Sequence, residues 1–177
     1  MVVSAGNNNS QINAADPSLR YSFPSQIPGT VTVGATAPNS TVFPWPAGTL
    51  PGTNFDFRPT YSNYGADVDI YAPGGRGFIN AIQSQVTAAC STQSPGCETG
   101  RQYLSINGTS MAAPHVAGVA ALIVSRTGAA RGLERVEAVE RCLYDSGDPI
   151  TVAVGTVSDV KPRLNALRAA TQACAGL

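Results

Sequence analysis

Charged side chains are scarce in this sequence of 177 residues. Asp, Glu, Lys and Arg together make up 12% of it, about half of the usual share, and their formal charges sum to zero. A chain with so little charge of either sign offers no basic surface for a nucleic acid and no patch for an anionic membrane. Neither is therefore expected as a partner.

Histidine and long apolar runs are also lacking. His115 is the only histidine, which excludes a metal site built from several imidazoles. No apolar run is long enough to span a bilayer. The N-terminal segment has neither the basic stretch nor the apolar length of a signal peptide.

Cysteine is present in an even number, without the Cys-x-x-Cys spacing of a zinc site: Cys90, Cys97, Cys142 and Cys174. Two disulfides are favoured over free thiols, with Cys90 paired to Cys97 across a short turn and Cys142 paired to Cys174 between two predicted helices. Disulfides imply an oxidising compartment. We therefore expect a secreted protein whose true N-terminus lies upstream of Met1.

The remaining composition is that of a globular domain, with 43% hydrophobic residues and enough length for one core. Apolar runs at 1–6, 29–36 and 66–75 end in small residues, glycine or proline and predict short strands. The proline-rich stretch 42–60 and the cysteine-bounded stretch 86–103 have no period and predict loops.

Three helices are predicted in the second half of the chain. The first begins at Thr109 and is apolar almost all round, as suits a buried helix, with Pro114 near its fourth position. Two amphipathic helices follow, the second starting with Pro162 in the N1 position. Their apolar stripes are Leu133, Val136, Val139 and Leu143, and then Leu164, Leu167 and Cys174. Strands alternating with helices favour an α/β domain with a mainly parallel sheet.

Ser110 follows a glycine turn and precedes the first predicted helix. The N–H groups at a helix N-terminus have no partner within the helix, and they can stabilise an oxyanion when a hydroxyl attacks a carbonyl. Two other interpretations stay open: Ser110 caps the helix, or the helix end binds an anion.

Several segments resemble the subtilisin-like serine proteases, in family order. The stretch NGTSMAAPHVAG at 107–118 is similar to the nucleophile motif, VVSAGNNN at 2–9 to the oxyanion segment, and GTVTVGAT at 29–36 to the strand after it. YSNYGADVDIYAPGG at 61–75 is especially like the proteinase K branch, and PRLNALRAA at 162–170 resembles the final helix. The resemblance covers residues 1–177 and implies the C-terminal part of a doubly wound, mainly parallel α/β domain.

The resemblance implies a role for each matching residue. Ser110 would be the nucleophile, and Asn7 would donate its side-chain N–H to the oxyanion. Ser4, Ala5 and Gly6 would form one wall of the pocket for a polypeptide substrate. No cofactor is needed for this chemistry. The proteinase K branch also implies a structural calcium site at Asp69 and the carbonyls of Pro28 and Thr30, whose oxygen ligands suit this ion.

The base and the acid that orients it are expected before residue 1, because the family order is Asp, His, Ser. His115 lies five residues after Ser110 on the same predicted helix, about 140° round and ~7.5 Å along, and cannot reach its hydroxyl. Asp145 imitates the aspartate motif but follows a helix, so we interpret it as a turn. We therefore expect an endopeptidase portion that is inactive by itself and needs the N-terminal part of the domain. The alternative is a truncated, non-catalytic homologue that binds peptide.

Overall fold

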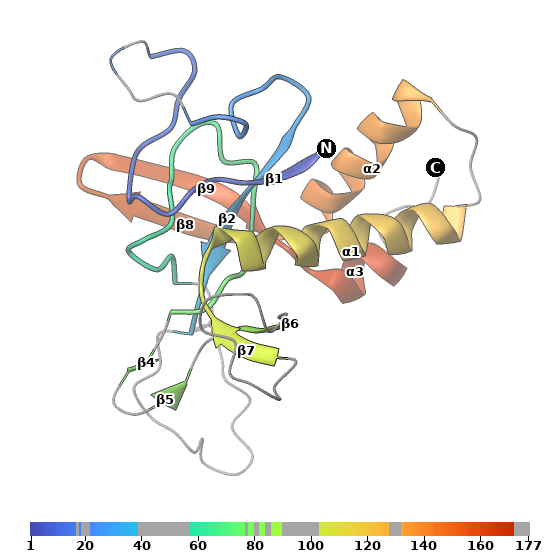
Figure 1. Cartoon of the computed structure of the whole chain (residues 1–177). Coiled ribbons are helices and arrows are strands. Elements are labelled where there is room, and N and C mark those ends of the chain that lie inside the picture. Colours follow the sequence, from blue (N-terminus) through green and yellow to red (C-terminus); the bar gives the residue numbers. More distant parts are fainter. Residues whose placement is uncertain are drawn as a thin grey trace.

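Five strands form the central sheet, in the order β1-β2-β3-β9-β8 (Figure 1). The computed structural model describes residues 1–16, 18, 22–38, 57–76, 78–79, 82–83, 86–89, 103–127 and 132–171. The strands are β1 (Val2–Ser4), β2 (Val31–Thr36), β3 (Ile70–Pro73), β8 (Asp148–Val154) and β9 (Val157–Arg163). All neighbours pair in parallel except β8 with β9. The fold is thus α/β with a mostly parallel sheet, as predicted.

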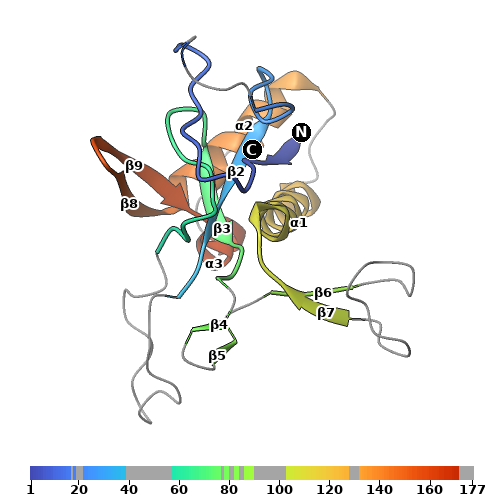
Figure 2. The same ribbon diagram turned by 60° about the vertical axis from the view of Figure 1, so that its left-hand side comes forward.

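Three helices share one core with the sheet: α1 (Thr109–Thr127), α2 (Leu133–Asp145) and α3 (Ala166–Thr171). Figure 2 shows α1 end-on beside β2 and β3. Because side chains alternate along a strand, β2 sends every second residue into this core. The buried apolar members include Val31, Val33, Ala35, Ile70, Ala72, Val116, Ile123, Val139 and Leu143.

The opposite face of β2 and β3 is covered differently. There Tyr71 packs with Ala5, Ile12 and Val68 from loop segments and with Ile150 and Val152 of β8. Gly34 makes room for the Tyr71 ring, since a Cβ at Gly34 would lie 2.3 Å from the nearest ring atom. The sheet is therefore closed on this face by loops and by the β8–β9 hairpin, with no helix among the described residues.

Helix α1 is buried against the sheet on one side and leaves apolar residues uncovered on the other. Ala117, Ala121 and Leu122 are exposed, and Leu122 is 52% exposed. An apolar pocket of about 170 Å³ lies between β1, α1 and α2. Pro114 is the sixth residue of α1, further inside the helix than predicted, so the carbonyl of Ser110 has no i+4 N–H to accept from.

The C-terminal region differs from the prediction. Pro162 lies in β9, opposite Pro149 of β8, and does not start a helix. The final helix, α3, begins at Ala166, and Leu167 is exposed instead of lying on a buried stripe. Pro149 is tolerated in β8 because β8 is an edge strand. Pro162 is tolerated in β9 because β9 pairs with β3 only at Arg163, opposite Tyr71. The missing N–H of Pro162 therefore breaks no hydrogen bond between β9 and β3.

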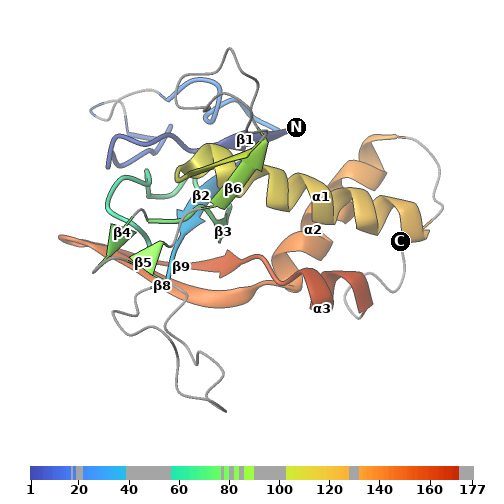
Figure 3. The same cartoon turned by 60° about the horizontal axis from the view of Figure 1, so that its bottom comes forward.

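Two small antiparallel pairs are separate from the main sheet, below it in Figure 2 and in front of it in Figure 3. They are β4 (Phe78–Ile79) with β5 (Ile82–Gln83), and β6 (Val86–Ala89) with β7 (Tyr103–Ile106). The stretch 86–103, predicted as a loop, thus has strand structure at both ends. Most of the stretch 42–60, together with Cys90, Cys97 and Cys174, lies outside the described residues.

Helix α2 confirms part of its predicted stripe: Val139 and Leu143 are buried, whereas Val136 is 45% exposed. Cys142 is buried on the same helix and is not a free thiol. Its predicted pairing with Cys174 stays a prediction, because Cys174 is not among the described residues. None of the described helices has the length and apolar character that a bilayer crossing requires.

Candidate active site

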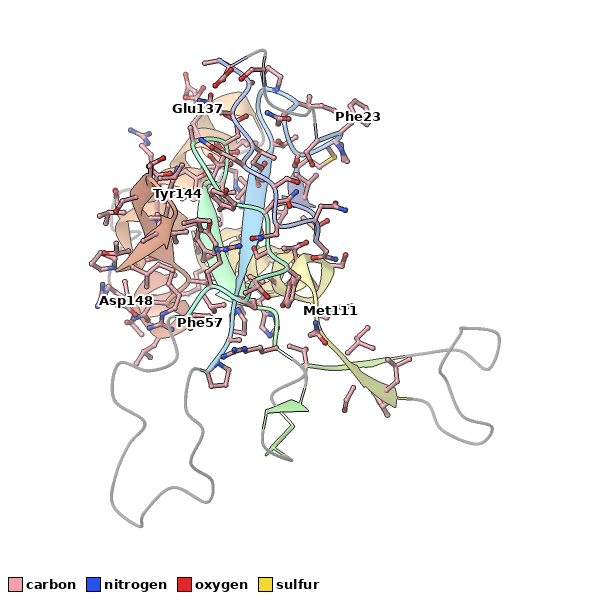
Figure 4. All side chains as sticks on the ribbon, turned by 90° about the vertical axis from the view of Figure 1, so that its left-hand side faces the viewer. Phe23, Phe57, Met111, Glu137, Tyr144 and Asp148 are labelled. Carbon is pink, nitrogen blue, oxygen red and sulfur yellow. The ribbon has the colours of Figure 1, made fainter. Side chains whose placement is uncertain are left out.

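Ser110 is the second residue of α1 and is exposed. The turn before it is tied to the loop after β3, because the Gly108 N–H donates to the Gly74 carbonyl over 2.8 Å. Met111, labelled in Figure 4, marks this end of the helix, where α1 follows β7. The Ser110 N–H has no acceptor within the described part of the chain, as expected for the first turn of a helix.

Asn7 lies in the loop after β1 and is bonded to the residue directly before Ser110. Its Oδ1 accepts from the N–H of Thr109 and from the Thr109 hydroxyl, both over 2.9 Å. These two donors fix which end of the Asn7 amide is the oxygen. Its Nδ2 therefore carries the free N–H groups, and it has no hydrogen-bond acceptor among the described residues. The fold thus brings Asn7 next to the Ser110 turn, although Asn7 and Thr109 are 102 positions apart in the sequence.

Ser4, Ala5 and Gly6 lead from β1 to Asn7. Ser4 pairs with Val33 in the sheet, and the buried Ala5 donates its N–H to the Val33 carbonyl over 2.9 Å. Gly6 has a φ of +100°, which favours glycine, and its N–H donates to the Thr109 hydroxyl over 3.1 Å. The segment is therefore held by the sheet at one end and by α1 at the other.

Sequence reasoning missed two residues that hold this loop, Thr109 and Asn63. Both are buried, and each bonds to residues around Asn7. Nothing in their local sequence indicates the contact, since the partners are distant along the chain. A third residue, Tyr61, donates its hydroxyl to the Gly75 carbonyl beside the Ser110 turn, and burial raises the pKa of this phenol above its ordinary value.

Neither His115 nor Asp145 forms a hydrogen bond with Ser110 in the described part of the chain. His115 is exposed on α1, and its Nδ1–H donates to the Met111 carbonyl of the preceding turn over 2.8 Å. Asp145 is the last residue of α2, and the N–H of Ser146 after it donates back to the Cys142 carbonyl. His115 is thus a structural residue of the same helix as Ser110, and Asp145 belongs to the turn that ends α2, as the sequence interpretation has them.

The three residues of the implied calcium site line one cavity of about 290 Å³: Asp69, Pro28 and Thr30. One carboxylate oxygen of Asp69 accepts from the Thr32 N–H over 2.7 Å, and burial raises the pKa of this carboxyl. No donor among the described residues faces the carbonyls of Pro28 and Thr30. The described residues hold no group of three His, Cys, Asp or Glu side chains suited to a metal, so an ion here would depend on carbonyls and water.

An exposed serine at the head of a helix, on a mostly parallel sheet and beside an amide with free N–H groups, is an arrangement typical of serine hydrolases of the α/β class. The comparison with known families gives the narrower answer. Residues 1–146 match the model of the subtilase family, and the chain belongs to this family.

Individual relatives are proteases. Proteinase R of Parengyodontium album is 32% identical over 163 residues, which are 89% of this chain and 30% of that protein. The extracellular serine proteinase of Thermus sp. strain Rt41A is 35% identical over 122 residues, 69% of this chain and 20% of that protein. The chain thus spans less than a third of the length of these relatives.

Solved structures agree in fold. A protease structure from Pseudoalteromonas arctica PAMC 21717 has a TM-score of 0.62 and 28% identity, over 96% of this chain and 41% of that one. A lanthipeptide protease matches with a TM-score of 0.67 over 96% of this chain and 49% of that one. Because the identity is 22%, this second match shows similarity of fold only.

Proposed function

We propose that this chain carries the nucleophile and the oxyanion donors of a subtilisin-like serine endopeptidase. In this proposal Ser110 Oγ attacks the carbonyl carbon of a peptide bond, and the oxyanion that forms accepts from the Ser110 N–H and from Asn7 Nδ2. The supporting observation is the pair of hydrogen bonds from Thr109 to Asn7 Oδ1, which leaves the Asn7 Nδ2 donors free on the residue bonded to the direct neighbour of Ser110. Ser4, Ala5 and Gly6 would bind the substrate backbone along the same segment.

The proton of Ser110 needs a base, and we propose that another part of the polypeptide supplies it together with the orienting acid. The only histidine of this chain is His115, and its ring is bonded to its own helix. A serine without a base is a weak nucleophile. By this proposal the chain alone is inactive, and the Asp- and His-bearing part of the domain completes it.

Hydrolysis assays test the proposal directly. The chain alone should cleave a peptide ester and a denatured protein no faster than its Ser110→Ala variant does. An extended polypeptide that includes the upstream part, or a mixture of the two parts, should cleave both substrates, and Ser110→Ala should abolish that cleavage. Cleavage by the chain alone that is lost in Ser110→Ala would mean that a base has been missed.

An inert extended polypeptide would favour the second candidate function, a non-catalytic homologue that binds peptide. The exposed apolar side of α1 and the outer edge of β1, which pairs with β2 alone in the described part of the chain, are surfaces on which such a module would act, since apolar patches and strand edges favour association. Binding of an unstructured peptide with equal affinity by the chain and by Ser110→Ala would support that function.

Secretion and two disulfides belong to the same proposal. Two relatives are named as extracellular proteases, those of Thermus sp. and of Xanthomonas campestris. Cys142 is buried and not free. Non-reducing peptide mapping should join Cys142 to Cys174 and Cys90 to Cys97. A peptide that joins Cys90 to Cys142 would contradict this pairing.

We further propose that Ca²⁺ binds at Asp69 and the carbonyls of Pro28 and Thr30. The shared cavity and the desolvated carboxylate support it, since hard oxygen ligands suit this ion and an adjacent cation offsets the burial of a negative charge. A hundredfold excess of Ca²⁺ over Kd should stabilise the chain by roughly 2–3 kcal/mol in thermal unfolding. Asp69→Asn should lose this gain, whereas Asp145→Asn, at the exposed end of α2, should keep it. Equal gains in both variants would exclude the site.

A further inference from the structure

Asn63 is an almost fully buried asparagine, 3% exposed, in the segment between β2 and β3. Both the oxygen and the nitrogen of its side-chain amide form hydrogen bonds within one short loop. Its Oδ1 accepts from two backbone N–H groups, its Nδ2 donates to one carbonyl, and its own backbone N–H donates to a second carbonyl. These partners are Asn8 N at 3.1 Å, Ser10 N at 2.9 Å, Ala5 O at 2.8 Å and Gly6 O at 2.9 Å.

The four partners bracket Asn7, two before it and two after it. The amide side chain accepts through Oδ1 on one side of Asn7 and donates through Nδ2 on the other, whereas a carboxylate of the same size only accepts and an aliphatic chain does neither. Gly6 allows the approach, because a Cβ at that position would lie 2.6 Å from Asn63 Nδ2. The contact with Asn63 therefore explains why the loop has glycine directly before Asn7.

Asn63 is itself fixed to the sheet. The neighbouring Ser62 is fully buried, and its Oγ accepts from the Ala35 N–H of β2 over 3.0 Å. Tyr61 adds a further bond, since its carbonyl accepts from the Asn9 N–H over 2.9 Å. The hydrogen bonds of residues 61–63 thus connect the loop around Asn7 to strand β2. These bonds do not involve Thr109 or α1.

We propose that Asn63 is the positioning residue of the oxyanion loop, holding the backbone on both sides of Asn7 while Thr109 holds the Asn7 side chain. This inference rests on the proposed role of Asn7 as an oxyanion donor. Preorganised donors stabilise developing charge only when they are held in place before the reaction. Neither bond of Thr109 to Asn7 fixes the backbone of residues 8 to 10, so the side-chain anchor alone leaves that part of the loop free.

Nuclear magnetic resonance of the full chain tests the role without any need for turnover. Two readouts are measured: hydrogen exchange of the Asn8 and Ser10 backbone amides, and the side-chain Nδ2 signals of Asn7. Asn63→Ala should speed exchange of both amides by about tenfold or more and move the Asn7 signals toward those of a free asparagine, because the shared acceptor is removed. Asn63→Asp should keep both amides slow, since a carboxylate still accepts, yet still shift the Asn7 signals through the lost bond to Ala5.

Asn165→Ala is the matched control. Asn165 also uses both ends of its amide, donating to Asp148 and accepting from the Arg168 N–H at the start of α3, but it contacts nothing near Asn7. Its loss should leave the exchange of both loop amides and the Asn7 signals unchanged. An equal change in Asn165→Ala would show general loosening and overturn the proposal, and so would an Asn63→Ala chain in which nothing near Asn7 changes.

If Asn63→Ala does not fold, the Asn7 Nδ2 signals of Asn63→Asp test the proposal by themselves. Unshifted Asn7 signals in that variant would overturn it. The test also separates this inference from the proposed function. A chain that never hydrolyses peptides in any form still gives these signals. An active enzyme in which Asn7 is insensitive to Asn63 would contradict only the positioning role.

Discussion

Thr109→Val removes one oxygen atom from the centre of the candidate site and keeps the volume of the side chain. The Thr109 hydroxyl is fully buried, accepts from the Gly6 N–H over 3.1 Å and donates to Asn7 Oδ1 over 2.9 Å. Valine leaves the Gly6 N–H without an acceptor. Asn7 Oδ1 keeps one donor, the Thr109 N–H.

The magnitude follows from these two changes. Gly6 is partly buried, so its unsatisfied N–H should cost about 1–2 kcal/mol, and the lost bond to Asn7 about 1 kcal/mol more; we expect a loss of roughly 2–3 kcal/mol in the free energy of unfolding. Thr109→Ser is the control, because it keeps the hydroxyl and removes only a buried methyl group, at a cost of about 1 kcal/mol.

Urea unfolding followed by circular dichroism measures both variants. Thr109→Val should shift the midpoint to a clearly lower urea concentration than Thr109→Ser, with an unchanged m value. A loss in Thr109→Val that is smaller than the loss in Thr109→Ser would refute the reasoning, since the methyl group and not the hydroxyl would then be the stabilising part of Thr109.

Three further predictions concern the rest of the fold. Gly34→Ala should destabilise by roughly 1–3 kcal/mol through the clash with the Tyr71 ring, and a second change, Tyr71→Leu, should recover part of the loss; additive losses in urea unfolding would contradict this. Tyr71→Phe should cost little or stabilise by up to about 1 kcal/mol, because the buried Tyr71 hydroxyl has no partner among the described residues. Burial raises the pKa of Tyr71 above that of an unfolded tyrosine, so the free energy of unfolding should fall as the pH rises above 10. The fall should be less steep in Tyr71→Phe. Equal slopes of the free energy of unfolding against pH in both proteins would exclude Tyr71 as a contributor. Asp148→Ala should cost roughly 1–3 kcal/mol, since Asp148 bonds Arg163 over 2.7 Å and Arg168 over 2.8 Å; a thermal melt equal to that of the wild type would show that these half-exposed pairs contribute nothing.

The strands β1, β2 and β3 and the helices α1 and α2 were predictable because each is marked locally, by an apolar run or stripe with a breaker near its end. The β8–β9 hairpin was missed although Val152 and Ile150 alternate with exposed residues and Gly155, with a φ of +58°, marks the turn. Pro162 by itself predicts a helix start, and that prediction conflicts with the alternation of a strand. A proline is compatible with either structure, and only the pairing with β8 decides between them.

For the candidate site, the residue types came from local motifs and from the resemblance, but the supporting contacts did not. Thr109 looks like an ordinary helix-start residue, and Asn63 looks like a loop asparagine between a serine and a tyrosine. Their importance depends on which loop lies opposite them in the fold. Which side of α1 is covered was not readable from the sequence, because an apolar sequence shows what a helix can bury and not what is there to cover it.

The contacts around Asn7 have a consequence for the order of folding. The bonds that shape this loop connect residues 58, 102 and 103 positions apart. Closing such long loops is entropically costly and slow, and no local element forms this geometry in advance. The loop should therefore acquire its final shape among the last steps of folding, after α1 has docked on β2. A short peptide containing residues 2–9 would not adopt it, and grafting that segment onto another protein would transfer the sequence without the geometry.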